Sequence, residues 1–371
     1  MELFTPVELP ETGLKIDYTK KLAFFGSCFA DNISAQFAQR KFCTFANPFG
    51  TVYNPLSIER MLRNIASGKV FGEGDVFQDL RAGNGGDGTG SKGKNARGPW
   101  HSWDAHSSLS AASREECICK LNEAAQQARE FLQQADVVFV TLGSAFVYSL
   151  KDFAGNNAGN IAGGHVVANC HRQDPRMFDR RLVPVEEAAE AIRGIVECLR
   201  RLSPAAHMVF TVSPIRHPGD GAHGNNLSKA TVLLAVNQVV AEMQASATPI
   251  EYFPSYEIVM DELRDYRFYE SDMIHLSKTA EQIIFERMVE CYCDGTTRDN
   301  IAKVEKFLKM ANHRIVDANS PATQAFLEKV RGEAAKLVSE IACLDPSPRK
   351  GDHGSLRAEA QVTKVGLRLS G

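Results

Sequence analysis

Five short apolar runs, spaced far apart along the chain, define the expected core. They occupy residues 22–25, 42–45, 137–142, 208–212 and 250–253. Several of these runs are continuously apolar instead of alternating with polar residues, which is typical of strands covered on both faces. The intervals between the runs are too long for hairpins. The pattern therefore predicts a parallel sheet of five strands.

Helical patterns fill the intervals between these runs. Apolar residues recur at three- and four-residue steps after Pro184, which is suited to the start of a helix, and again over residues 226–243. Ile33 and Phe37 mark a shorter helix after the first run. Strands that alternate with helices indicate βαβ units, whose right-handed crossovers cover both faces of a sheet. We predict an α/β fold, a three-layer α/β/α sandwich around a mainly parallel five-stranded sheet.

Residues 81–98 interrupt this pattern. They include seven glycines and no aliphatic side chain larger than alanine, so burial could not offset the entropy lost on ordering them. The segment follows no apolar strand and opens no helix, as a phosphate-binding loop must. We therefore expect a mobile insertion without a nucleotide.

The chain changes character after Cys293. Residues 301–310 and 322–344 have helical patterns, and residues 345–371 are polar and rich in Lys, Arg, Ser and Gly. We assign residues 1–295 to the α/β domain and residues 296–371 to a C-terminal helical extension with a polar tail. The helices of this extension are candidates for forming a homo-oligomer.

Composition and charge narrow the class of protein. The chain has 371 residues, of which 44% are hydrophobic, and a formal net charge of −3. These values indicate a folded globular protein without the basic surface that nucleic acids attract. The N-terminus lacks the pattern of an export signal, and no run approaches the ~20 apolar residues of a membrane-spanning helix. We expect a cytoplasmic protein that binds neither nucleic acid nor membrane.

The nine cysteines are odd in number and scattered, which favours reduced thiols over a disulfide framework. Two pairs, Cys117/Cys119 and Cys291/Cys293, have one residue between their members. Structural zinc sites instead space their ligands as C-x₂₋₄-C and repeat the pair within a compact module. We predict buried thiols here and no metal site.

Candidate chemistry lies where strands end, because ligands of open parallel sheets bind outside the carboxyl ends of the strands. Gly26, Ser27 and Cys28 follow the first run, within the stretch KLAFFGSCFADNI at residues 21–33. A serine becomes a useful nucleophile when a histidine, oriented by a carboxylate, takes its proton. Asp272 and His275, three positions apart, supply such a pair. A tight turn would hold the carboxylate against one imidazole nitrogen and leave the other facing Ser27.

Two other interpretations of these residues are open. Gly26 could simply provide a tight strand exit, while Ser27 or Asp31 caps the next helix. Asp272 could hydrogen-bond its own backbone within a surface turn. Neither interpretation requires catalysis.

Several sequence blocks, in order, resemble a known family. An apolar strand ending in Gly-Ser and a late Asp-x-x-His resemble the SGNH/GDSL hydrolase superfamily, and GSCFA at residues 26–30 resembles the signature of its GSCFA-domain branch. The resemblance extends over residues 1–295. Its other blocks are NPFGTVYNP (47–55), VTLGSAFVY (140–148), NCHRQDPRMF (169–178), TVSPIRH (211–217) and DMIHLS (272–277).

The resemblance implies a flavodoxin-like topology and a catalytic triad, with Ser27 as nucleophile, His275 as base and Asp272 as its orienting carboxylate. It also implies three donors to the oxyanion of the reaction. Two are the backbone N–H groups of Ser27 and Gly50.

The third donor in related hydrolases is an asparagine side chain, and here the chain departs from the family pattern. The sequence reads Gly143-Ser144-Ala145, with alanine where the asparagine is expected. One such donor contributes about 2.7–4 kcal/mol to transition-state stabilisation. Ser144 is assigned to the oxyanion site, and the other candidates to replace the asparagine are Asn47, Asn54 and Arg216.

We assign substrate binding to five polar residues near the predicted strand ends. Arg216 is an alternative ligand for an anionic substrate group. A thiol-protease interpretation of Cys170 next to His171 is disfavoured, because Cys170 does not follow a strand-to-helix elbow. The five residues are Asn47, Asn54, Arg216, His217 and His171.

The resemblance implies a serine-dependent esterase or acyltransferase that acts on ester-linked acyl groups, mainly O-acetyl groups of carbohydrates. No metal or other cofactor is implied, and the expected partner is a small-molecule or carbohydrate ester. The alternative is a catalytically inactive carbohydrate-binding or scaffold protein, which the missing asparagine keeps open. Water and sugar hydroxyls compete for the same acyl-enzyme, so the sequence does not separate hydrolysis from transfer.

Overall fold

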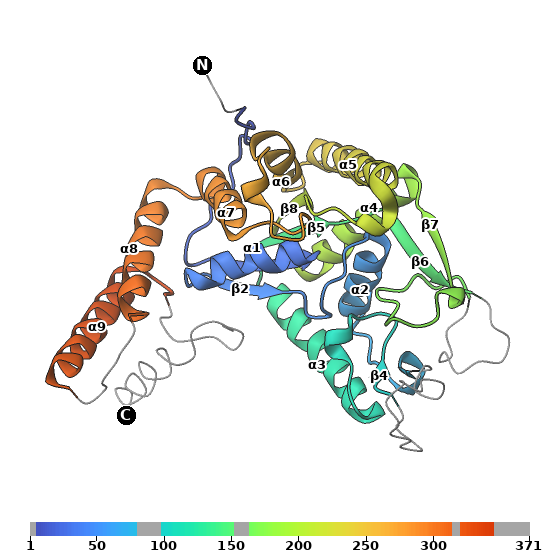
Figure 1. The fold of residues 1–371 in the computed structure, drawn as a ribbon, viewed down its shortest axis with the longest axis horizontal. Coiled ribbons are helices and arrows are strands. Elements are labelled where there is room, and N and C mark those ends of the chain that lie inside the picture. The colour runs from blue at the N-terminus through green and yellow to red at the C-terminus, as the bar shows by residue number, and fades with distance from the viewer. Residues whose placement is uncertain (1–4, 80–97, 152–162, 314–319, 345–371) are drawn as a thin grey trace. The chain divides into compact units, whose positions relative to one another are not determined.

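The computed structural model describes residues 5–79, 98–151, 163–313 and 320–344. Its central sheet is parallel and has the strand order β2-β1-β5-β8-β9 (Figure 1). All five predicted strands are present with boundaries shifted by about one residue, which confirms the α/β sandwich. The strands are β1 (Lys21–Gly26), β2 (Cys43–Ala46), β5 (Val137–Leu142), β8 (His207–Val212) and β9 (Ile250–Tyr252).

Four helices cover one face of this sheet. They share one hydrophobic core with alternate strand residues such as Phe25, Val140 and Phe210. Within this layer α2 packs against α4, and α4 packs against α5. The helices are α2 (Pro55–Ser67), α3 (Arg114–Leu132), α4 (Val185–Leu202) and α5 (Gly221–Ala245).

The other face of the sheet carries the intervening strand residues. The rings of Phe24 and Phe139 stack there with centroids 4.7 Å apart. Helix α1 (Cys28–Gln39) connects β1 to β2, in the opposite direction along the sheet from the later crossovers. Because crossovers are right-handed, α1 belongs to this face.

Two small sheets are inserted between the main elements. Strands β6 (Phe146–Leu150) and β7 (Phe178–Leu182) pair antiparallel, as do β3 (Phe77–Gln78) and β4 (Trp100–His101). The sequence pattern did not predict these pairs, nor helices α2 and α3. The predicted glycine-rich insertion at residues 81–98 lies outside the described residues, apart from Gly98.

The described residues belong to two compact units. The first comprises Met1–Pro10, Leu22–Ser34 and Phe45–Glu281, and it includes every candidate site residue. Within this unit, helix α6 (Ser255–Glu257) follows β9.

The second unit comprises Glu11–Lys21, Ala35–Thr44 and Gln282–Gly371. Its buried Arg40 donates hydrogen bonds to the side chains of Gln36, Gln282 and Glu305. The helices that follow the α/β sequence pattern are α7 (Lys278–Tyr292), α8 (Gly295–Ala311) and α9 (Pro321–Glu340), and α8 packs against α9.

The predicted domain boundary at residue 295 and the oligomerisation of the C-terminal helices stay predictions. The polar tail at residues 345–371 lies outside the described residues. Within the described part of the chain, no helix is both long enough and apolar enough to cross a membrane.

Candidate active site

Strand β1 ends at a glycine, Gly26, and any other residue at this position would displace the neighbouring backbone of β5. Gly26 has φ +130°, and a Cβ at this position would lie 2.0 Å from the carbonyl oxygen of Thr141. The N–H of Gly26 donates to Asn47 Oδ1 at 2.8 Å. The N–H of Ser27 donates to the Thr141 carbonyl at 3.3 Å, so the ladder between β1 and β5 extends to Ser27.

The Ser27 hydroxyl is buried and has no hydrogen-bond partner among the described residues. The residue as a whole is 4% exposed. The alternative in which this hydroxyl caps α1 is therefore wrong, because a capping oxygen accepts a backbone N–H. Buried hydroxyls without a partner are uncommon, and catalytic serines are one recognised cause.

Cys28, the other potential nucleophile, starts α1 and is partly buried. Burial and the nearby Asp31 carboxylate raise the pKa of its thiol, although backbone N–H groups at the helix start and Lys229 oppose them. The thiolate is the reactive form of cysteine, so a raised pKa lowers its reactivity at neutral pH. The local chemistry therefore favours the Ser27 hydroxyl over the Cys28 thiol as the candidate nucleophile.

Asp272 and His275 form the pair that their spacing suggests. Asp272 Oδ2 accepts a 2.6 Å hydrogen bond from His275 Nδ1, and Asp272 Oδ1 accepts the N–H groups of Ile274 and His275, each at 2.9 Å. The imidazole bond, followed by the two backbone N–H bonds, lowers the pKa of Asp272 to about 2. Met273 has φ +59°, which lets the turn close. The carboxylate holds the proton on Nδ1 and leaves Nε2 as the acceptor.

The backbone bonds of Asp272 also match the surface-turn interpretation, so they fit a structural role as well as the predicted catalytic role. The His275 side chain is 56% exposed. No hydrogen bond joins it to Ser27 Oγ. Catalytic hydrogen bonds are often long or absent before substrate binds, so the triad stays a prediction.

The two backbone donors that the resemblance implies are both bonded within the fold. Besides the bond from Ser27, the N–H of Gly50 donates to the Asn47 carbonyl at 2.8 Å. Gly50 has φ +73°, and a Cβ there would collide with His106 and Ser108. In this arrangement neither N–H is free to meet an oxyanion.

Ser144 is also bonded within the fold. Its Oγ lies 3.0 Å from Ser228 Oγ and accepts the N–H of Phe146 at 3.0 Å. Ala145 is 0% exposed, belongs to the core beneath α2–α5, and donates its N–H to Ser228 Oγ at 2.8 Å. A side chain at position 145 therefore lies in the core and is not open to a substrate.

The two candidate asparagines brace the backbone. Asn47, with φ +38°, donates from Nδ2 to Asp31 Oδ1 at 2.8 Å while its Oδ1 holds Gly26. Burial raises the pKa of Asp31, and the hydrogen bonds from Asn47 and Thr51 act against it. Asn54 caps α2 by accepting the N–H of Ser57 at 2.8 Å. These bonds explain both asparagines without a substrate.

Arg216 and His217 follow β8. Arg216 is exposed and donates to Asn226 Oδ1 at 2.7 Å. His217 stacks on Tyr53 with ring centroids 5.1 Å apart, and burial and Lys229 lower its pKa. Both side chains stay candidates for substrate contact.

His171 is buried, and its Nε2 lies 2.7 Å from the Ser102 carbonyl. Burial, reinforced by the neighbouring His101, lowers the pKa of His171 to about 4. The Nε2–H of the neutral ring donates to that carbonyl, and Nδ1 faces Ser107 Oγ at 3.2 Å. These contacts anchor the loop that contains Ser102 and Ser107.

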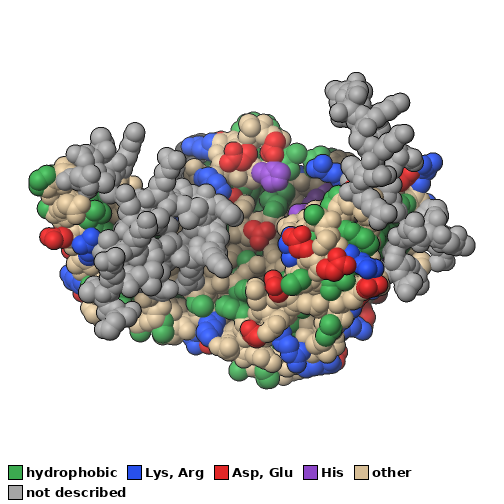
Figure 2. Space-filling model, turned by 90° about the horizontal axis from the view of Figure 1, so that it is seen from below, with side chains coloured by type: hydrophobic (Ala, Val, Ile, Leu, Met, Phe, Trp, Pro, Cys, Tyr) green, Lys and Arg blue, Asp and Glu red, His purple; other side chains and the backbone are tan. Residues whose placement is uncertain are grey.

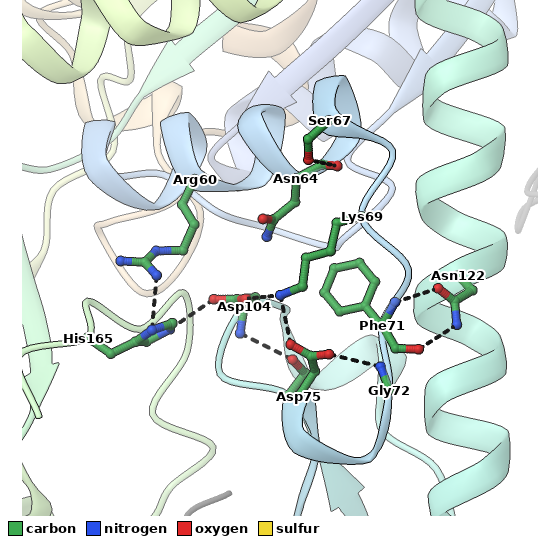
Figure 3. Close-up of polar contacts among 11 residues, drawn as sticks. Arg60, Asn64, Ser67, Lys69, Phe71, Gly72, Asp75, Asp104, Asn122 and His165 are labelled. Atoms are coloured by element: carbon green, nitrogen blue, oxygen red, sulfur yellow. Dashed lines mark hydrogen bonds and ion pairs between the residues drawn. The ribbon is translucent and has the colours of Figure 1, made fainter. Parts of the chain in front are cut away.

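A polar network supports the neighbouring loop (Figure 3). Arg60 of α2 donates to His165 Nδ1 at 3.0 Å, and His165 Nε2 donates to Asp104 Oδ1 at 2.9 Å. Lys69 Nζ lies 3.6 Å from Asp104 and 2.7 Å from Asp75. Burial would raise the pKa of Asp104, but the hydrogen bond from His165 and the nearby cations lower it on balance. The network fixes the segment whose His106 packs against Gly50.

Sequence reasoning missed Lys229, which lies at the carboxyl edge of the sheet. Its side chain comes from α5, and Nζ donates to the carbonyls of Gly143 and Ser213, both at 2.6 Å. Burial, with help from Arg216, lowers the pKa of Lys229 to about 7. The available signal was a run of polar residues on the buried face of α5, since Asn225, Ser228 and Lys229 are all buried.

The described residues give no sign of a metal cluster, and the face in Figure 2 has mixed charge. On the face in Figure 2, Lys and Arg side chains are interspersed with Asp and Glu, and histidine lies beside acidic groups. No group of three or more His, Cys, Asp or Glu side chains suited to a metal ion occurs within the described ranges.

Comparison with protein families identifies the family of this chain. The model of the GSCFA family matches residues 21–288, from β1 into α7. No curated protein matches the chain. The matched range includes Ser27, the Asp272–His275 pair and Lys229.

Proposed function

The chain belongs to the GSCFA family, and from that premise we propose that it is a serine-dependent esterase or acyltransferase. The observation that carries the proposal is the buried, unpartnered hydroxyl of Ser27 at the carboxyl end of β1. The Asp272–His275 pair, which leaves Nε2 open to accept a proton, supports it. Carboxyl ends of parallel strands are where open α/β sheets bind ligands.

The reaction follows from these groups. Ser27 Oγ attacks the carbonyl carbon of an ester, and its proton passes to His275 Nε2. Asp272 stabilises the imidazolium through the bond to Nδ1. The imidazolium gives the proton to the departing alkoxide, which leaves as an alcohol. The acyl group remains on Ser27 Oγ as the acyl-enzyme.

The second half of the reaction repeats these steps with a new nucleophile. Water, deprotonated by His275, releases a carboxylic acid, or a substrate hydroxyl takes the acyl group. The exposed turn that carries His275 must bring Nε2 within reach of Ser27 Oγ when substrate binds. Product analysis with and without an acceptor alcohol distinguishes hydrolysis from transfer.

We propose ester-linked acyl groups of carbohydrates, mainly O-acetyl groups, as the substrate class. The support is the resemblance to carbohydrate-active branches of the SGNH superfamily, which is an analogy. Arg216 and His217, after β8, are the candidates for contacting the sugar. No cofactor takes part in this scheme.

A serine-directed fluorophosphonate probe tests the proposal. We expect the native protein and Cys28→Ala to be labelled, and Ser27→Ala to lose the label. Cys28→Ala is the matched control because it changes the adjacent nucleophile. Labelling that survives in Ser27→Ala would contradict the assignment of the nucleophile.

Two observations favour a second candidate, an inactive carbohydrate-binding or scaffold protein. No hydrogen bond joins Ser27 Oγ to His275, and the N–H groups of Ser27 and Gly50 are bonded within the fold. This candidate predicts no probe labelling and no turnover of short-chain aryl esters, together with calorimetric binding of acetylated oligosaccharides. Turnover that depends on Ser27 would exclude it.

A further inference from the structure

Lys229 is a buried cation that has no role in the steps proposed above. The residue is 1% exposed, and none of the ion pairs among the described residues includes it. Two neutral carbonyls are its hydrogen-bond partners. A buried ammonium without a carboxylate is costly, because carbonyl dipoles replace only part of its hydration. Negative charge that develops beside it would offset this cost.

The position of Lys229 is fixed by the two strands that it joins. Gly143 follows β5 and Ser213 follows β8, so the ammonium lies between the carboxyl ends of these adjacent strands. Strand β1, which ends at Ser27, is the neighbour of β5 on the other side. Since adjacent strands lie about 4.8 Å apart, Lys229 Nζ is offset from β1 by roughly 7 Å. That gap suits a serine side chain carrying an acyl group.

Ser27 and Lys229 both lie at the carboxyl edge of the sheet. Ser27 directly follows the last residue of β1, and the Lys229 ammonium, which comes from α5, bonds the carbonyls that directly follow β5 and β8. Cys28, next to Ser27, and Lys229 are close enough that each charge affects the other.

We propose that the Lys229 ammonium is a donor of the oxyanion site and replaces the asparagine side chain absent at position 145. This inference rests on the proposed function. An ammonium has three N–H donors, and the carbonyls of Gly143 and Ser213 occupy two, which leaves the third for the substrate. The two carbonyl bonds fix Nζ before substrate arrives, as an electrostatically preorganised site requires.

The tetrahedral intermediate forms and collapses without proton transfer from Lys229. As the bond from Ser27 Oγ to the carbonyl carbon forms, the carbonyl π pair moves onto oxygen. The ammonium donates a hydrogen bond to this oxyanion and keeps its proton. When the intermediate collapses, the pair returns and the alkoxide departs.

Steady-state hydrolysis of p-nitrophenyl acetate tests the inference. We expect Lys229→Met to lower kcat by about 10²–10³-fold, as loss of one oxyanion donor does, with KM changed less than about threefold. Lys303→Met, an exposed lysine of α8, is the matched control and should retain full activity. Circular dichroism and thermal unfolding show whether each variant is folded.

Chemical rescue by added amines distinguishes a role of Lys229 as a charged hydrogen-bond donor from a purely structural role. In Lys229→Ala, added methylammonium should restore activity at least tenfold, while tetramethylammonium, which has no N–H, should not. Native-like activity of folded Lys229→Met, absence of rescue in a folded Lys229→Ala, or unfolding of both variants would overturn the role of Lys229 as a donor.

The outcomes also separate the two proposals. If the native protein is active and Lys229→Met is unimpaired, this inference fails and the proposed function stands. If the native protein neither hydrolyses the ester nor reacts with the fluorophosphonate probe, the proposed function fails and the oxyanion role of Lys229 fails with it.

Discussion

Ser27 and Cys28 are adjacent in the sequence, but their surroundings give them different chemistry. The Ser27 hydroxyl is buried without a partner, and burial raises the pKa of the Cys28 thiol. Gly26, with φ +130° and no Cβ, lets the backbone of β1 lie close to Thr141 of β5, and the N–H of Ser27 then bonds the Thr141 carbonyl. The choice between hydroxyl and thiol thus depends on the backbone as well as on side-chain reactivity.

The pH dependence of turnover follows from Lys229. The titratable and charged groups around it are Cys28 on α1 and Arg216, His217 and Asp220 on the segment before α5. Burial first, and Arg216 next, lower the pKa of Lys229 to about 7, while Cys28 and Asp220 oppose them. Since deprotonation removes the charged donor, kcat should fall as pH rises through about 7.

Lys229→Arg provides the control, because guanidinium stays charged throughout this range. We expect its kcat to be lower than that of the native protein but its alkaline limb to move up by at least one pH unit. Full pH–rate profiles measure both effects. An alkaline limb at the same pH in both proteins would contradict the assignment to Lys229.

The candidate site was only partly predictable from residue types. The spacing of Asp272 and His275 correctly suggested their contact, because the turn is local. Lys229 was not predictable as part of the site, because its two carbonyl partners follow strands that are distant in sequence. The bonded state of Ser144 likewise depends on Ser228 of α5.

At the scale of elements, the apolar runs located the sheet well because buried parallel strands are continuously hydrophobic. Helix α2 was missed although Asn54 caps it and Pro55 occupies its first turn, since Asn54 was interpreted as a functional residue. Helix α3 was missed because its buried stripe is narrow and includes Ala125 and Ala128. The β6–β7 pair has exposed positions and lacks a continuous apolar run.

The network between α2 and the loop near Gly50 gives a prediction for stability. Asp104→Asn should lower the free energy of unfolding at pH 7 by about 3 kcal/mol, because it removes the buried carboxylate that accepts a hydrogen bond from His165 and forms an ion pair with Lys69. The folded-state pKa of Asp104 is lowered, so its contribution is present above the unfolded-state pKa and disappears as pH falls through the folded value.

Urea unfolding at pH 7 and at pH 3 measures this effect. The difference between the native protein and Asp104→Asn should be smaller at pH 3. Asp174→Asn, which alters an exposed pair with Arg176, is the matched control and should leave stability unchanged. An equal difference at both pH values would show that the Asp104 charge does not stabilise the fold.

At the scale of the whole molecule, the site groups belong to one of the two compact units. Ser27 is more than 200 residues away in sequence from Lys229, Asp272 and His275, yet all four lie in this unit. The proposed catalytic centre, with Ser27 as its proposed nucleophile, is therefore contained in one unit.

Trapping the acyl-enzyme is the most direct test of Ser27 as the nucleophile. The native protein is mixed with p-nitrophenyl acetate, quenched in acid within the first turnover, digested and mapped by mass spectrometry. We expect one acetyl group on Ser27, which accumulates only slowly in His275→Ala and is absent in Ser27→Ala. Acetyl transfer to Cys28, or ester turnover that persists in Ser27→Ala, would contradict it.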